Sequence, residues 1–391
     1  MFFGEKLSAL RELNGLSRKD LGLKLGITEQ AVWQYEMENV VPRVDILKVI
    51  CENFSVEGKY FYRPAFLKTV ATEERIAYRT KDRDSRKKTK LELTYLNFVA
   101  TYINYFEQFL TVPHAMINEL CQNVIEMMKG AEGPASSQIT SVADAARAFL
   151  KITSNQDLMY ALESSGIYVV EKDLGTQIDA YSAITEDGQP FIVLGTIKKT
   201  AVQRNFDLAH ELGHILLHGR VDMETLSKQE YQLVEQQADD FALAFLLPEE
   251  AFVADFKDVQ RRSNPDAYID LKRKYQVAIT ALEQRAYRLG LLNYQENRYF
   301  YRQRHRKGYQ EFEPLDEVLV PIKPGRVRAL LQVIFNQQVV SAQGVAEQFH
   351  VTPEFLVRLF DLDPNFFVPY LQPQRVFFSG DNVVQLQKLK R

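Results

Sequence analysis

Cysteine and long apolar runs are scarce in this chain of 391 residues, and each scarcity excludes a class of protein. Its two cysteines, Cys51 and Cys121, fit neither a disulfide framework nor a cysteine-rich metal site, so we expect two buried, unpaired thiols. No apolar run reaches the roughly 18 residues that a membrane-spanning helix needs. With no signal-peptide pattern either, we expect a cytoplasmic protein with no membrane partner.

A basic excess is also missing. Lysine and arginine number 48 against 51 aspartates and glutamates, which gives a formal net charge of −3. This balance excludes a protein that coats nucleic acid non-specifically. Apolar residues make up 46% and charged residues 25%, as in ordinary globular proteins, and the length allows two to three domains.

The strongest signal is the pentapeptide from His210 to His214, which reads HELGH. Positions i and i+4 share one face of a helix, so His210 and His214 can bind the same metal ion. Glu211 then lies beside them, where it can act on a water molecule. The runs "GIYVVEKD", "IDAYSAIT" and "GQPFIVLGT" precede this helix and predict the strands of a small sheet.

The next helix supplies a third metal ligand. His218 is tempting but lies about 12 Å along the helix from His210, so we expect only an interaction with the helix dipole. The amphipathic stretch "QEYQLVEQQADDFALAFLLPEE" places Glu235 and Asp239 on one face. We assign Glu235 as the third ligand, with Asp239 accepting the second ring N–H of a ligand histidine. The alternative is that both carboxylates are simply solvated.

The stretches "RNFDLAHELGHILLH" and "EQQADDFALAFLLP" resemble the ImmA/IrrE family of zinc metallopeptidases, and the resemblance spans roughly residues 140 to 320. It implies a gluzincin-like site in which His210, His214 and Glu235 hold Zn²⁺, with Mn²⁺ as a substitute in vitro. In such a site Glu211 acts first as general base and then as general acid. Tyr181, His218 and Arg204 are unranked candidates to assist the oxyanion or the substrate.

The N-terminus predicts a separate DNA-binding unit. Ser17 and Thr28 cap two short helices that are joined by a turn at Gly26. The stretch resembles the lambda-repressor-like (XRE) helix-turn-helix domain, which implies a double-stranded DNA operator as partner. By that resemblance the groove-facing residues are Thr28, Glu29, Gln30 and Gln34, and the candidate phosphate contacts are Arg18, Lys19 and Arg43.

The charge of this unit argues against strong DNA binding by one copy. Residues 1–60 hold eight Lys/Arg against nine Asp/Glu, so we expect a homodimer or locally placed charge to supply affinity. The alternative is a helix-turn-helix that contacts only protein.

Three further segments have open roles. Residues 79–90, "RTKDRDSRKKTK", predict a solvated linker, or otherwise a basic patch or a substrate for a protease. The basic-aromatic "RYFYRQRHRKGYQ" suits an exposed helix end or single-stranded DNA as an activating signal. Near the C-terminus "SAQGVAEQFHVTPEFLVRLF" predicts a helix-turn-helix-like pair without a clear role, followed by a hairpin that turns at Gly380-Asp381.

Together these patterns predict a multidomain, mainly α protein with an α+β zincin-like core. The expected domains are a helix-turn-helix head (1–65), a basic linker and helical connector (66–138), a zinc peptidase (139–295) and an accessory domain (296–391). The expected function is a DNA-binding regulator whose zinc endopeptidase cleaves a helix-turn-helix repressor, or itself, and so relieves repression in a stress, DNA-damage or mobile-element response. The alternative is a transcription factor or antitoxin with a structural or sensory zinc site.

Overall fold

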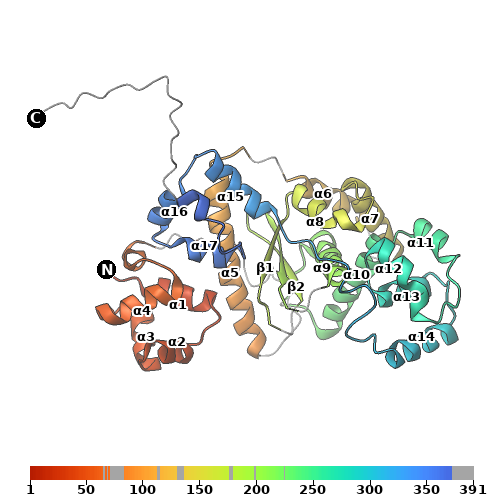
Figure 1. Ribbon diagram of the computed structural model, residues 1–391, viewed down its shortest axis with the longest axis horizontal. Helices are drawn as coiled ribbons and strands as arrows, with labels where there is room; N and C mark the ends of the chain where they lie inside the picture. The colour runs from red at the N-terminus through yellow and green to blue at the C-terminus, as the bar shows by residue number, and fades with distance from the viewer. Residues whose placement is uncertain are drawn as a thin grey trace, which may run out of the picture.

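The structure is a computed structural model that describes residues 1–64, 67, 69–70, 83–111, 115–129, 136–175, 179–197, 200–223 and 225–371, with the backbone alone for residues 83–88. Its elements follow one another along the long axis, from a helical head through a small sheet to a helical far end (Figure 1). Helices predominate in the described residues and three strands form one sheet, which confirms the predicted mainly α fold with an α+β core.

The head is a helix-turn-helix unit, as its capping residues predict. The Ser17 hydroxyl accepts a hydrogen bond from the amide of Asp20, and the Thr28 hydroxyl accepts one from Ala31. Gly26 lies between the two helices with φ of 66°, a left-handed conformation that glycine adopts at little steric cost. The head elements are α1 (Gly4–Leu13), α2 (Arg18–Leu25), α3 (Glu29–Met37), α4 (Val44–Phe54) and the 3-10 helix η1 (Gly58–Tyr62).

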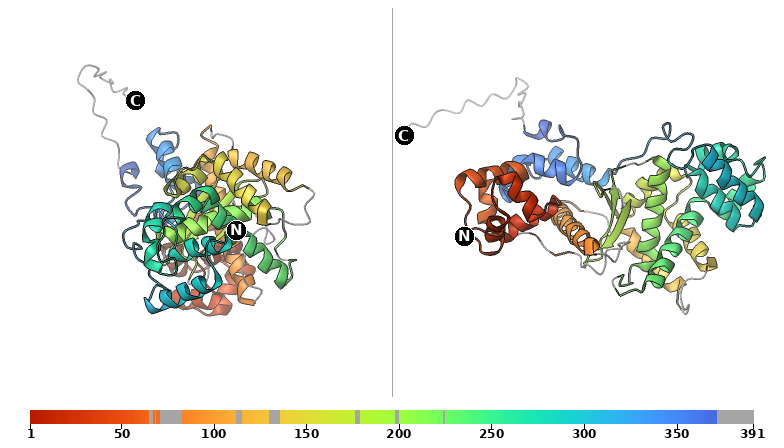
Figure 2. Two further views of the ribbon diagram at one scale, coloured as in Figure 1. Left: turned by 90° about the vertical axis from the view of Figure 1, so that its right-hand side faces the viewer. Right: turned by 90° about the horizontal axis from the view of Figure 1, so that it is seen from below.

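Helix α5 (Arg83–Glu107) joins the head to the sheet. Lys90 Nζ lies 3.0 Å from Glu12 Oε1 of α1, and the Tyr95 hydroxyl donates to the Glu171 carbonyl of the sheet at 3.4 Å. The figures agree that α5 lies between the head and the sheet (Figure 2). Its aromatic side chains at Tyr95, Phe98, Tyr102 and Phe106 are buried within the chain, so this aromatic-rich segment is a connector.

The sheet has strand order β1-β3-β2. Strands β1 (Tyr168–Lys172) and β3 (Pro190–Gly195) are parallel, and β2 (Ala180–Ile184) runs antiparallel to β3. Because successive side chains alternate between the two faces of a sheet, the strands contribute side chains to two separate hydrophobic cores. One face packs with α5 through Tyr168, Val170, Tyr181, Ala183, Phe191 and Val193, and the other packs with α9 through Val169, Ile192 and Leu194.

The second core contains the HExxH helix, α9 (Ala201–Gly213), which continues as a π-helix, η4 (His214–His218). Phe300 of α14 packs on Tyr268 in this core, so the domain boundary expected at 295 falls within a helix of the same packing unit. The other elements around it are α6 (Met116–Met127), α7 (Ser136–Phe149), η3 (Asn155–Asp157), α8 (Leu158–Ser164), α10 (Lys228–Leu246), α11 (Glu249–Phe256), η5 (Pro265–Tyr268), α12 (Ile269–Tyr275), α13 (Ile279–Arg288) and α14 (Tyr294–Arg306).

After α14 the chain returns along the molecule and packs on α5 (Figure 1). This C-terminal unit consists of α15 (Arg326–Asn336), α16 (Ala342–Phe349), α17 (Pro353–Leu359) and α18 (Val368–Leu371).

Among the described helices, not one is long and apolar enough to cross a membrane. Cys51 and Cys121 are free thiols, as expected, but each is half-buried, so the expectation of fully buried thiols was wrong. Residues 79–82 of the basic segment and the hairpin expected around Gly380 lie outside the described residues.

A buried ion-pair network holds the head together and generates a prediction. The Glu36 side chain is 0% exposed, and its carboxylate accepts from Arg11 Nε at 2.5 Å and from Arg18 Nε at 2.6 Å. Glu36→Gln leaves the buried Arg11 without its anion, so we expect the head to lose about 3 kcal/mol of unfolding free energy. Fluorescence of Trp33, the only tryptophan, reports head unfolding in urea.

The exposed Glu38→Gln, on the same turn, is the matched control and should unfold like the wild type. Equal urea midpoints for Glu36→Gln and the wild type would contradict a stabilising role for the network.

Candidate metal centre and active site

The HExxH helix is anchored at its start and bears its functional groups at its end. Thr200 and Gln203 form a reciprocal capping box that fixes the first turn of α9. Leu208, Ala209 and Leu212 are buried against the sheet and α10, which turns His210 and Glu211 to one side. The change from α-helix to π-helix at His214 widens the last turn, a distortion common at functional sites.

Three donor groups converge at this helix end. His210 Nε2 and His214 Nε2 lie 3.0 Å apart, and Glu235 carboxylate oxygens lie 3.8 Å from the first and 3.6 Å from the second. Their donor atoms all lie within 4.8 Å of one another. Two zinc–nitrogen bonds of about 2.0–2.1 Å at a tetrahedral angle separate the nitrogens by roughly 3.3 Å, so this donor set fits zinc.

His210 is oriented from behind by a carboxylate. Its Nδ1 lies 2.9 Å from Asp239 Oδ1, which leaves Nε2 directed toward His214 and Glu235. Burial alone would lower the pKa of His210, but the hydrogen bond to Asp239 and the nearby carboxylates of Glu211 and Glu235 raise it to about 9. The structure therefore places Asp239 where the sequence analysis expected it.

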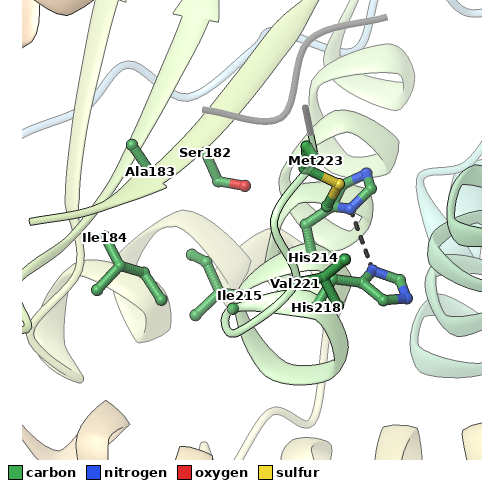
Figure 3. Close-up of a pocket in the computed structure, with 9 residues that line it drawn as sticks. Ser182, Ala183, Ile184, His214, Ile215, His218, Val221 and Met223 are labelled. Atoms are coloured by element: carbon green, nitrogen blue, oxygen red, sulfur yellow. Dashed lines mark hydrogen bonds between the residues drawn. The ribbon is translucent and has the colours of Figure 1, made fainter. Parts of the chain in front are cut away.

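His214 is oriented by a second histidine. Its Nδ1 lies 3.2 Å from His218 Nδ1 (Figure 3). His218 Nε2 in turn lies 3.0 Å from Gln237 Oε1. The Gln237 oxygen can only accept, so His218 carries its proton on Nε2 and accepts at Nδ1 from His214. That tautomer leaves His214 Nε2 with a lone pair for a metal. Burial lowers the pKa of His218 to about 4 and that of His214 well below its usual value, which favours the neutral form of both rings.

Glu211 is buried beside the donor cluster and is 5% exposed. Burial raises the pKa of its carboxyl to about 7, although His210 and a hydrogen bond from Ser182 oppose the shift. Its Oε2 has no hydrogen-bond partner among the described residues. The side chain thus has one oxygen held by the sheet and one available for a water molecule.

None of the three residues proposed to assist the oxyanion or substrate faces the donor cluster with an unused polar group. Tyr181 lies on the opposite face of the sheet, where its hydroxyl donates to Glu92 Oε2 at 3.1 Å. Arg204 is buried in an ion pair with Glu171 and donates to the Ile322 carbonyl at 3.2 Å. Both ring nitrogens of His218 are used in hydrogen bonds, one with His214 and one with Gln237. The expected interaction with the helix dipole therefore does not describe all that His218 does.

Ser182 and Gln237 were not among the site residues predicted from the sequence. Strand alternation could have found Ser182, because a residue next to an inward-facing tyrosine must face the other side, toward α9. Gln237 lies two residues after Glu235 on α10 and carries no sequence signal of its own. The Tyr231 hydroxyl, one turn before Glu235, donates to Glu235 Oε1 at 2.8 Å and was also not foreseen.

A pocket opens between β2 and the end of the HExxH helix (Figure 3). The Ser182 hydroxyl points from the strand toward the side that carries His214. The apolar part of the lining consists of Ala183, Ile184, Ile215, Val221 and Met223. Among the described residues β2 pairs with β3 alone, so the pocket lies beside a strand at the edge of the sheet.

The expected DNA contacts lie together on the head but differ in availability. Glu29 and Gln30 are exposed at the start of α3 and Gln34 is half-buried one turn later, whereas Thr28 uses its hydroxyl as the helix cap. Lys19 is exposed. Two predicted phosphate contacts are engaged by acids instead, Arg18 by Glu36 at 2.6 Å and Arg43 by Asp45 at 2.9 Å.

Most of the basic-aromatic segment folds as α14, which belongs to the same core as the HExxH helix. Phe300 faces inward, whereas Tyr294, Arg298 and Arg302 border a shallow exposed surface.

Two known protein families match this chain, one over the region of the donor cluster and one over the head. Residues 162–287, which hold the sheet and the donor cluster, match the IrrE N-terminal-like domain of the peptidase M78 family. Residues 7–61 match a helix-turn-helix family. The resemblance read from the sequence, a helix-turn-helix joined to an ImmA/IrrE-type peptidase domain, is therefore confirmed. No curated protein matches the chain.

The hydrogen bonds that link His214, His218 and Gln237 form a relay behind His214. This relay predicts that His218 supports metal binding. His218→Ala removes the acceptor that fixes the His214 tautomer, and losses of such outer partners weaken metal binding by about 10- to 100-fold. Competition with a chromophoric chelator measures the zinc Kd. The exposed His305→Ala is the matched control and should bind zinc like the wild type. Unchanged zinc affinity in a folded His218→Ala protein would show that the relay has no such role.

Proposed function

We propose that the chain is a DNA-binding regulator with zinc-dependent endopeptidase activity. The observation that carries this proposal is the convergence of His210, His214 and Glu235 beside the buried Glu211. A structural zinc site is normally closed by four protein ligands, whereas only three donor groups converge among the described residues. A structural or sensory site would also have no use for Glu211, so the peptidase is the better-supported function.

The chemistry divides between the metal and the protein. Zinc at this site would lower the pKa of a water molecule to about 7 and polarise the carbonyl that is attacked. Glu211 takes a proton from the attacking water through its unpartnered oxygen and later delivers it to the leaving amine. Ser182 holds the other oxygen of Glu211, and the Asp239 and His218 contacts hold the two imidazoles in place.

The substrate would lie along β2. An extended peptide can add to a sheet edge through main-chain hydrogen bonds while pockets select its side chains. The pocket lined by Ile184, Ile215, Val221 and Met223 adjoins His214, so it would receive an apolar side chain close to the scissile bond. This arrangement suits an extended segment of a protein rather than a compact helix.

The helix-turn-helix head favours a regulatory protein as the substrate. Head and peptidase share one chain, so an operator bound by α3 would place the peptidase where repressors bind. We propose a helix-turn-helix repressor or this chain itself as substrate, and relief of repression as the outcome. Val70, before α5, accepts a hydrogen bond from Glu186 N at 2.8 Å, but it packs with α5 on the face of the sheet opposite the donor cluster, so self-cleavage would require this segment to leave that position.

The decisive substitution is Glu211→Gln, which keeps the side-chain shape and removes the base. We expect the variant to bind zinc but to cleave more slowly by about 10²–10⁴-fold. Purified chain is incubated with Zn²⁺ or Mn²⁺, with and without duplex DNA, alone and with co-encoded helix-turn-helix repressors. Fragments are identified by mass spectrometry.

Glu249→Gln, an exposed acid on α11, is the matched control and should cleave like the wild type. No cleavage by zinc-loaded wild type, or equal cleavage by Glu211→Gln, would contradict the peptidase assignment.

A further inference from the structure

The C-terminal unit repeats the helix-turn-helix of the head. Residues 17–36, "SRKDLGLKLGITEQAVWQYE", and residues 341–360, "SAQGVAEQFHVTPEFLVRLF", align without a gap. In both, a serine caps the first helix, by accepting from Asp20 N in α2 and from Gly344 N in α16. The second copy lies outside both family matches.

The turns of the two copies have the same backbone geometry. Gly26 and its counterpart His350 both adopt the left-handed conformation, with φ of 66° and 54°. The amide that follows closes the same bond in each copy, from Ile27 to the Gly22 carbonyl at 3.0 Å and from Val351 to the Ala346 carbonyl at 3.1 Å. The inward-facing positions also agree: Leu21, Leu25 and Val32 in the head, and Val345, Phe349 and Leu356 in the second copy, are all buried.

The two copies differ in what their second helix can reach. Helix α3 has Glu29 and Gln30 exposed at its start, as a helix that enters a DNA groove needs. In α17 the counterpart of Ala31 is Phe355, which packs on α5 with ring centroids 5.9 Å from Phe98 and 5.8 Å from Tyr102. A helix fixed in a core in this way is poorly placed to enter a major groove.

The second copy also lacks the charge that DNA binding needs. Residues 326–371 contain three arginines and no lysine, against four acids, Glu347, Glu354, Asp361 and Asp363. Arg326 is engaged with the Glu163 carbonyl at the start of α15. Arg358 is directed at the head, where it donates to the Asn53 carbonyl at 3.3 Å and to Ser55 Oγ at 2.5 Å. Phosphate neutralisation supplies most non-specific DNA affinity, so this unit is a poor DNA binder.

What the second copy does contact is the head. Val351, in its turn, forms an antiparallel bridge with Val56, just after α4 of the head. On either side of that bridge, Glu57 N donates to the His350 carbonyl at 2.8 Å and Thr352 N donates to the Ser55 carbonyl at 2.9 Å. In the head, the turn and the second helix are the parts expected to contact DNA. In the second copy, the same parts contact the backbone of the head.

We propose that residues 326–371 are a second helix-turn-helix unit whose binding partner is the chain's own DNA-binding head, and not DNA. The two units form an internal pseudo-dimer packed on α5, which fixes the head relative to the sheet and leaves α3 as the DNA-reading helix of the pair. This pairing rests on the contacts between the two units and is independent of peptidase activity.

Hydrogen exchange of the full chain tests this pairing, since the amides of Glu57 and Thr352 lie on different units and each donates across the interface. Arg358→Ala removes a charged donor, so both amides should exchange about tenfold faster while amides of α9 do not change. Ser55→Ala removes the acceptor from the head side and should have the same effect. Glu354→Ala, exposed one turn earlier on α17, is the matched control and should change neither amide.

Unchanged exchange at both amides in Arg358→Ala and Ser55→Ala, or faster exchange at Thr352 alone, would overturn the proposal. A second measurement adds a random-sequence 30-base-pair duplex at low ionic strength. Slower exchange in α17 on adding DNA would identify a second DNA-reading helix and overturn the proposal, whereas exchange in α17 that does not respond to DNA agrees with it.

Discussion

The close contact between α9 and α10 sets the geometry on which the site depends. At Gly213, between the two histidines of the motif in the sequence, an added Cβ would lie 3.0 Å from the Phe241 ring and 3.4 Å from Ala238 Cα. Glycine therefore lets the two helices approach closely enough for Glu235 to reach His210 and His214. The same contact brings Asp239 behind one imidazole and Gln237 behind the ring of His218, so a single packing interface sets both the donor groups and their supports.

The sheet lies between the donor cluster and the helix that contacts the head. Ser182 on β2 faces the HExxH helix and holds Glu211, whereas its neighbour Tyr181 faces α5 and bonds to Glu92. Glu92 also accepts from Lys172 of β1 at 2.8 Å, so α5 is tied to two strands of the sheet. Because Lys90 of α5 also contacts Glu12 of the head, α5 links the head to β2, the strand beside the donor cluster. The second helix-turn-helix packs on that same helix.

The sequence predicted the parts of the site that follow from helical spacing. His210 and His214 share a helix face at any HExxH, and the spacing of Glu235 and Asp239 placed both carboxylates toward them. Features that depend on tertiary packing were not predictable in this way. Tyr181 was proposed for its chemistry, but strand alternation turns it away. His218 was judged by its distance from His210, whereas its contact is with His214 in the π-helical turn. The helix-turn-helix pattern near the C-terminus was visible in the sequence, but its role depended on the three-dimensional contacts with the head.

The central claim is a three-ligand zinc site that keeps one coordination position for a water molecule. A crystal structure of the zinc-loaded chain, with anomalous diffraction recorded at the zinc edge, tests it directly. We predict one zinc ion bound by His210 Nε2, His214 Nε2 and a Glu235 oxygen at about 2.0–2.2 Å, with water as the fourth ligand. A fourth protein side chain that closes the coordination sphere, or zinc bound away from these residues, would contradict it.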